Sequence, residues 1–160
     1  MPFKLEFRLE PPGDKPLRRA FVVYKRIEDL TPVWQRMLPA IRNYIDRRIA
    51  TGGTHHSMPP FAPLSPRYAR YKARRYPSAP ILVRSGRLRE SLTTPDHPDA
   101  IADIQPDRLT FGTRIPYALY HQLGTQRMPA RPPIKLSKTL QTELLTILRN
   151  YLIQEGESNP

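Results

Sequence analysis

The sequence predicts an α+β fold in which a small antiparallel β-sheet packs against a long helix, with short helices, proline-rich arms and a C-terminal helix. Apolar residues recur at helical spacing over residues 34–49 and again over 136–151. Short apolar and β-branched runs around a Pro-Asp turn predict strands at 100–105 and 109–112. The 20 prolines against 7 glycines exceed what regular helices and central strands accommodate, so much of the chain must form loops or arms.

A length of 160 residues is that of one ordinary domain. We expect a single domain over residues 1–153 and a flexible polar segment over 154–160. The absence of cysteine excludes disulfides and thiolate chemistry and is compatible with a reducing cytoplasm. Since no apolar run approaches about 18 residues, we expect neither a secretion signal nor a membrane anchor.

Residues 1–28 predict an N-terminal β-hairpin. Apolar and charged residues alternate from Phe3 to Leu9, which is the period of a strand with one buried face. A break at 11–14 follows, and the aromatic and β-branched residues of 20–27 then favour a returning strand.

The long helix should begin at Thr31-Pro32, because a Thr or Asp side chain can cap a free amide and a proline in the first turn has no amide to satisfy. Pro39 lies inside it and should cause a kink, and the stretch 51–54 should end it. Its apolar face consists of Trp34, Met37, Leu38, Ile41, Ile45 and Ile49.

Short helices should follow. Ser65-Pro66 opens one that runs to about Arg75, and Leu88 and Leu92 share one face of another.

A compact helix should begin at Pro116 and end at Gly124, where a left-handed residue is favoured. An extended arm over 128–136 then leads to the C-terminal helix, which Ser137 should cap.

The formal net charge of +12 is concentrated between residues 65 and 89, which hold eight basic residues and no acid. Such a surface favours contact with a polyanion or with an acidic partner protein. The residues concerned are Arg67, Arg70, Lys72, Arg74, Arg75, Arg84, Arg87 and Arg89.

Tyr68 and Tyr71 lie three residues apart among these arginines and would share a helical face. Rings interleaved with cations are the ingredients of a nucleic-acid surface, but a shared face is equally what a short helix needs to dock on a core. We favour docking with a solvated basic face over specific nucleic-acid recognition, and nonspecific DNA contact stays open.

No catalytic, cofactor or metal site is expected. His55 and His56 are adjacent and would point apart in a strand or a helix, so they are better interpreted as loop histidines than as joint ligands. The aspartates between 96 and 107 lie among prolines, without the lysine or histidine spacing of a metal-dependent nuclease. The sequence also has no Gly-rich phosphate loop and no Gly-x-Ser-x-Gly motif.

Two segments, taken in their order and spacing, carry a family resemblance. The first is Phe-Ala-Pro-Leu-Ser-Pro-Arg-Tyr at 61–68, then Lys72, then Ile-Leu-Val-Arg-Ser-Gly-Arg-Leu-Arg-Glu-Ser-Leu at 81–92. The second is Phe-Gly at 111–112, Tyr-Ala-Leu-Tyr-His-Gln-Leu-Gly at 117–124 and Met-Pro-Ala-Arg-Pro at 128–132. Together they resemble the phage virion morphogenesis, or tail completion, family of contractile-tailed phages.

The resemblance implies a structural subunit, without catalytic activity, of a phage neck or tail-completion ring that joins the head connector to the tail during virion assembly. It implies a homo-oligomer, commonly of six copies, that meets portal-side connector or adaptor proteins and tail tube or tail terminator proteins. Such a protein would assemble in the host cytoplasm and reside in the virion, at the neck or head-proximal tail end. The alternative is a basic DNA-binding protein associated with phage DNA, which would bind duplexes strongly and with a steep salt dependence.

On this interpretation the second segment forms a subunit-interface motif. Its short helix should be held by polar side chains bonded to nearby backbone, and Arg131 should pair with an acidic group of its own or a neighbouring subunit. The basic stretch should face the exterior or an acidic neighbouring ring, since a cationic channel would hold back DNA. The motif residues are Tyr117, His121, Gln122, Gly124, Met128, Pro129, Ala130, Arg131 and Pro132.

Overall fold

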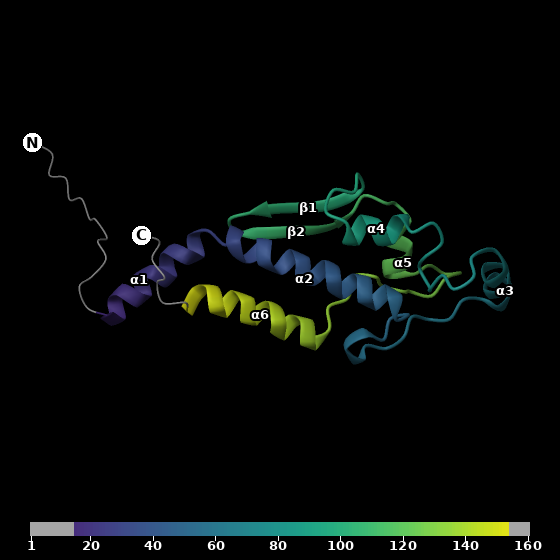
Figure 1. Ribbon diagram of the computed structural model, residues 1–160, viewed down its shortest axis with the longest axis horizontal. Helices are drawn as coiled ribbons and strands as arrows, with labels where there is room; N and C mark the ends of the chain where they lie inside the picture. Colours follow the sequence, from purple (N-terminus) through teal and green to yellow (C-terminus); the bar gives the residue numbers. More distant parts are fainter. Residues whose placement is uncertain (1–14, 154–160) are drawn as a thin grey trace, which may run out of the picture.

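Within residues 15–153, the part of the chain that the computed structural model describes, helices and a two-stranded antiparallel sheet make up an elongated molecule (Figure 1). The elements are α1 (Lys15–Glu28), α2 (Thr31–Ala50), the 3-10 helix η1 (His55–Ser57), α3 (Pro66–Arg75), α4 (Arg87–Thr93), β1 (Ala100–Gln105), β2 (Arg108–Thr113), α5 (Ala118–Leu123) and α6 (Lys138–Ile153). Helix α2 runs along the middle, with the sheet and α4 on one side and α6 on the other (Figure 1). The predicted α+β class is confirmed. None of the described helices has the length and apolar character needed to cross a bilayer.

Helix α2 forms the axis of the core. It begins where the sequence predicts, because the Asp29 carboxylate accepts a hydrogen bond from the Thr31 amide at 2.9 Å and Pro32 lies in the first turn. Pro39 lies inside the helix, which continues beyond it. The buried cluster around α2 consists of Val33, Met37, Ile41, Tyr44, Ile45, Ile49, Leu88, Leu92, Ile115 and Leu140.

The sheet and α4 cover one face of α2. The two strands pair in antiparallel register beginning with Ala100 opposite Thr113, around the predicted turn. Leu88 and Leu92 are the buried apolar residues of α4, as their spacing predicts. The Thr113 hydroxyl donates to Ser91 Oγ at 2.8 Å, which ties the second strand to α4.

The predicted hairpin over residues 1–28 is wrong for its second half, since residues 20–27 belong to helix α1. The reason is tertiary: α1 packs beside the end of α6, where the Arg26 guanidinium donates to the Tyr151 carbonyl at 2.8 Å. A cation at a helix C-terminus satisfies free carbonyls and the helix dipole, and this contact outweighs a weak strand propensity. The first predicted strand, at residues 3–9, lies outside the described residues.

Helix α6 covers the other face of α2. Ser137 caps it as predicted, since its hydroxyl oxygen accepts the Leu140 amide at 3.1 Å. The same oxygen lies 3.0 Å from Nδ1 of His56, so the cap also ties η1 to α6. Leu136, predicted on the apolar stripe, precedes the helix and is 42% exposed.

Leu140→Ala should lower the free energy of unfolding by about 2–5 kcal/mol, because the side chain is 0% exposed and its loss leaves a cavity between α2 and α6. Leu145→Ala on the same helix is the matched control, since Leu145 is 64% exposed and should change stability by less than about 0.5 kcal/mol. Urea unfolding of both variants measures the difference, and equal effects would show that α6 does not pack as described.

Candidate functional site

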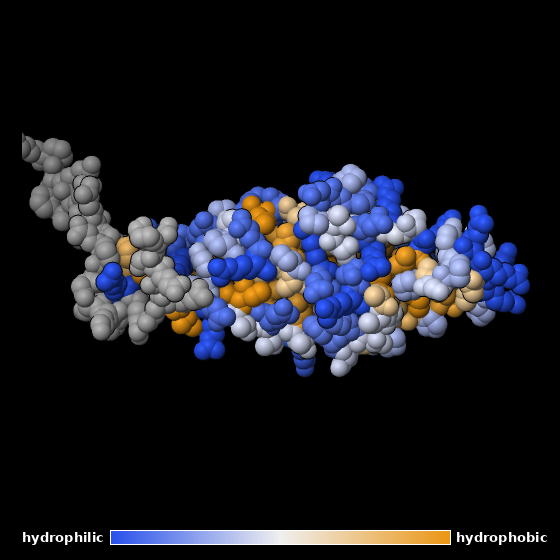
Figure 2. All heavy atoms as spheres, in the orientation of Figure 1, coloured by the Kyte–Doolittle hydropathy of each residue, from blue (hydrophilic) through white to orange (hydrophobic). Residues whose placement is uncertain are grey.

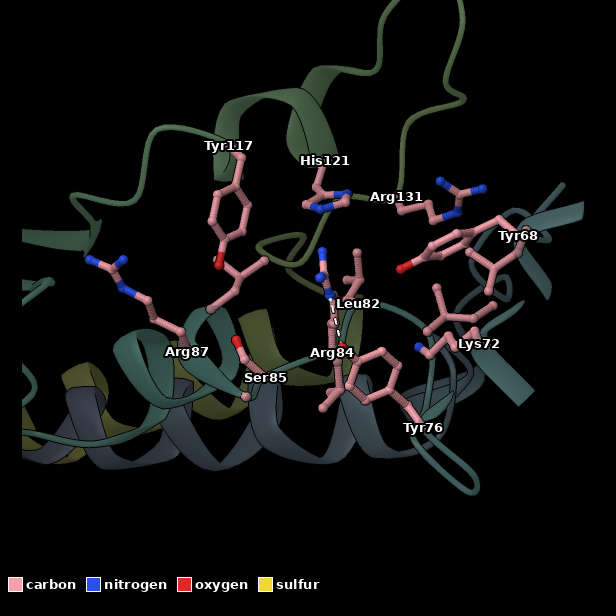
Figure 3. A pocket seen from close by; sticks show the side chains of 15 residues that line it. Tyr68, Lys72, Tyr76, Leu82, Arg84, Ser85, Arg87, Tyr117, His121 and Arg131 are labelled. Atoms are coloured by element: carbon pink, nitrogen blue, oxygen red, sulfur yellow. Dashed lines mark hydrogen bonds between the residues drawn. The ribbon is translucent and has the colours of Figure 1, made fainter. Parts of the chain in front are cut away.

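A pocket of about 580 Å³ brings together the two sequence segments singled out above (Figure 3). Tyr117, just before α5, and His121 of α5 point into it, and Arg84 enters from the opposite wall (Figure 3). Among the residues that the structure describes, four cationic side chains and no carboxylate line this cationic pocket. Its lining consists of Leu64, Tyr68, Lys72, Tyr76, Ile81, Leu82, Val83, Arg84, Ser85, Gly86, Arg87, Leu88, Tyr117, His121 and Arg131.

Arg131 is 5% exposed and binds backbone carbonyls. Its Nε donates to the Ala62 carbonyl at 2.6 Å and a terminal nitrogen donates to the Pro63 carbonyl at 2.7 Å. Its amide also donates to the His121 carbonyl at 2.7 Å. A buried guanidinium is tolerated only when its donors are satisfied, so this residue joins three segments into one unit. Among the described residues, the partners of the Arg131 side chain are backbone carbonyls, whereas the sequence leads us to expect a carboxylate.

Lys72 is the buried side chain of α3, at 6% exposure. Its ammonium donates to the Pro80 carbonyl at 2.5 Å, and burial lowers the pKa of the amine. Tyr68 and Tyr71 are 39% and 49% exposed, so the prediction that they dock α3 on the core is wrong. The helix is held by the stem and head of a lysine, because a long aliphatic chain can pack while its nitrogen reaches a carbonyl.

Arg48 of α2 is the third buried cation, beside Lys72 and Arg131. It is not among the residues that we single out from the sequence. It is 2% exposed, donates to the Gly53 carbonyl at 2.6 Å and lies 4.9 Å from the centre of the Phe61 ring. Its position seven residues after Ile41 and three after Ile45 places it on the apolar face of α2, which is a signal that the sequence contains.

The burial of these three cations against backbone carbonyls has one physical cause. Residues 53–80 include six prolines, each of which supplies a carbonyl acceptor without an amide donor. The segment therefore has a surplus of carbonyls, and buried carbonyls need donors. Arg48, Lys72 and Arg131 supply these donors from α2, from α3 and from the segment after α5.

The segment after α5 is fixed to the subunit itself. The Gln122 amide nitrogen donates to the Ile134 carbonyl at 2.8 Å, and the Ile134 amide donates to the Gln122 side-chain oxygen at 3.3 Å. Gly124 has φ +78°, and a Cβ there would lie 2.8 Å from the Ala130 amide nitrogen, so a side chain would force the turn open. The predicted arm at 128–136 thus folds back on α5, with Pro133 buried.

The motif residues divide between buried anchors and exposed surface. Gln122 of α5 is partly buried, as are Gly124, Met128 and Pro132 in the segment after it, whereas Pro129 and Ala130 are exposed. Tyr117 is 40% exposed and meets the His121 ring edge-on, with the ring centres 6.1 Å apart.

The eight predicted basic residues occupy three places. Lys72, Arg84 and Arg87 line the cationic pocket, where the Arg84 guanidinium donates to the Tyr76 hydroxyl at 3.3 Å and lowers the pKa of that phenol. Arg87 bonds Asp99 at 2.7 Å. Arg89 pairs with Asp46 of α2 at 2.6 Å, outside the pocket. The exposed outer face of α3 carries Arg67, Arg70, Arg74 and Arg75 around Tyr71.

Arg131→Ala should lower the free energy of unfolding by about 2–5 kcal/mol, because two carbonyls would be left without donors in a buried site. Arg131→Lys should recover only part of this loss, since one ammonium does not reproduce the guanidinium fork. Arg127→Ala, at an exposed position four residues earlier, is the control and should be nearly neutral. Denaturant melts that place Arg131→Ala and Arg127→Ala together would contradict the anchoring role.

Two histidines should make the protein less stable in mild acid. Burial lowers the pKa of His121, with Arg131 adding to the effect, and burial, His56 and Arg47 lower the pKa of His55. Below the ordinary value of 6.5 the unfolded chain binds protons that the folded chain refuses, so stability falls as pH drops from about 7.5 to 5.5. Unfolding curves at both pH values should show a smaller loss for His55→Gln/His121→Gln, and an unchanged loss would refute the assignment.

No curated protein and no solved structure matches the chain. A profile of the phage virion morphogenesis family matches residues 15–153, which include α1, both strands and the whole cationic pocket. The matched region covers most of the chain and takes in both segments of the resemblance. The chain therefore belongs to the phage virion morphogenesis family, and its role is in the structure or assembly of a phage particle.

Proposed function

We propose that the chain is a structural subunit of a ring at the phage neck or tail-completion position, and that it joins the head connector to the tail. One observation carries the proposal: α5 has no buried residue, yet it presents Leu119, Tyr120 and Leu123 at 59%, 55% and 70% exposure. Apolar and aromatic side chains gathered on a fixed surface are typical of protein interfaces. Figure 2 shows apolar surface among hydrophilic residues in the region where α5 lies.

Exposed apolar side chains also lie on α1 and at the end of α6, and these elements are at the other end of the molecule from α5 (Figure 1). Helix α1 exposes Tyr24 and Ile27, both at 54%, and α6 exposes Ile153 at 59%. Two different surfaces at opposite ends suit a heterologous contact, in which one end of each subunit meets the other end of the next. Repeated around an axis, such contacts close a ring, for which we propose six copies.

The proposed partners are other virion proteins. On one side we propose portal-side connector or adaptor proteins, and on the other tail tube or tail terminator proteins. The role requires no chemistry, which agrees with the use of Lys72 and Arg131 as donors to structural carbonyls. We therefore propose that the protein is not an enzyme.

The outer face of α3 favours a second candidate, a basic DNA-binding protein associated with phage DNA. Its four exposed arginines surround Tyr71, so phosphate contacts and stacking are both available. Arg70→Gln/Arg74→Gln should weaken retention on duplex DNA at low salt without changing assembly. If retention persists at physiological salt and the wild-type protein does not assemble, this candidate replaces the ring.

Leu123→Asp should prevent assembly while leaving the fold intact, because the side chain is 70% exposed and its replacement places a charge in an apolar contact. Leu145→Asp, at a 64% exposed leucine of α6, is the matched control and should assemble normally. Electron microscopy of the purified proteins and infection by particles carrying each variant provide the measurement. Normal rings and infectious particles from Leu123→Asp would refute the α5 interface.

A further inference from the structure

We infer that the cationic pocket binds the acidic segment 154–160 of the next copy of the chain in the ring. The inference rests on the proposed ring and adds to it a specific contact between subunits. Within the described residues, the pocket gathers Lys72, Arg84, Arg87 and Arg131 without a lining carboxylate. Such a site favours an acidic occupant.

Among the pocket cations, and counting only partners within residues 15–153, Arg84 has neither a carbonyl nor a carboxylate partner. Lys72 and Arg131 donate to backbone carbonyls, and Arg87 bonds Asp99. The exposed Arg84 meets the Tyr76 hydroxyl at 3.3 Å and the Tyr76 ring at 5.8 Å from its centre, which are neutral partners. A carboxylate would accept charge-assisted hydrogen bonds from its guanidinium, and the side chains of Tyr68 and Tyr117 lie across the same pocket (Figure 3).

The segment that follows α6 has the matching chemistry. Its sequence, Gln-Glu-Gly-Glu-Ser-Asn-Pro, contains Glu155 and Glu157 and no basic residue. The glycine between the two acids and the small polar residues around them offer little bulk, so one or two side chains fit a volume of about 580 Å³. A duplex would have to bring a phosphate into the space between α3 and α5, whereas the exposed outer face of α3 meets a duplex more easily.

The length of the segment indicates that it comes from another copy of the chain. Helix α6 has 16 residues, which at about 1.5 Å each span roughly 24 Å. Helices α3, α4 and α5 contribute to the pocket, and α3 and α5 lie beyond the start of α6, away from its C-terminal end (Figure 1). Seven extended residues reach about 25 Å at most, so the segment falls short of its own pocket after retracing α6. In an end-to-end ring the neighbouring pocket is the nearer one.

The test is a double-mutant cycle on the full chain, with Glu155→Gln/Glu157→Gln as one arm and Arg84→Gln as the other. At low salt each arm should raise the protein concentration at half-assembly by on the order of tenfold, and the combined variant should be no weaker than either arm. Arg36→Gln, at an exposed position on α2, is the matched control and should leave assembly unchanged. Mass photometry over a concentration series measures the assembly, and thermal unfolding checks that the fold is kept.

Three outcomes overturn the inference in distinguishable ways. If the variants of both arms assemble at the same concentration as the wild-type protein, or if their effects on assembly simply add, the segment does not bind the pocket. The proposed ring would be unaffected by this result. Loss of DNA retention by Arg84→Gln with normal assembly would make the pocket a polyanion site. A wild-type chain that stays monomeric at all concentrations and in the particle would refute the ring itself.

Discussion

The structure depends on buried cations that donate to backbone carbonyls. Arg48, Lys72 and Arg131 bind the carbonyls of a proline-rich segment that offers more acceptors than donors. A carboxylate partner would fix one side chain to another, whereas a carbonyl partner fixes a side chain to the path of the chain itself. These bonds help to offset the entropy cost of fixing a backbone, about 1–2 kcal/mol per residue, so segments without regular secondary structure can hold a defined conformation.

That constraint explains how a six-residue helix can serve as an interface. Helix α5 is too short to be stable alone and buries none of its residues, but Gln122 and the segment around Arg131 hold its end. Its apolar side chains are then presented without further ordering when a neighbour binds, and preorganised surfaces bind more tightly for the same area. The same anchors form one wall of the cationic pocket, so the two proposed contacts belong to one rigid end of the subunit.

Much of the fold is predictable because its boundaries have local chemical signals. Prolines in the first turn mark α2 and α3, a Ser or Asp side chain accepts an amide at the start of α2, α3 and α6, and a glycine with positive φ marks the end of α5. Helix α1 is not predictable in this way, because its aromatic and β-branched residues favour a strand until α6, more than a hundred residues later, is placed beside it. The motif around Arg131 is visible in the sequence, but its partners are not. Every residue has a backbone carbonyl, so the sequence does not indicate which carbonyls Arg131 binds.

We propose that the rigid end formed by α5 and the Arg131 anchor meets the opposite end of the next subunit. Membership of the phage virion morphogenesis family makes the particle the place to look. A cryo-electron microscopy map of the assembled particle tests the claim most directly. We predict a closed ring in which α5 of each copy lies against α1 and α6 of its neighbour. A map in which the protein is absent, or in which α5 faces solvent in every copy, would contradict it.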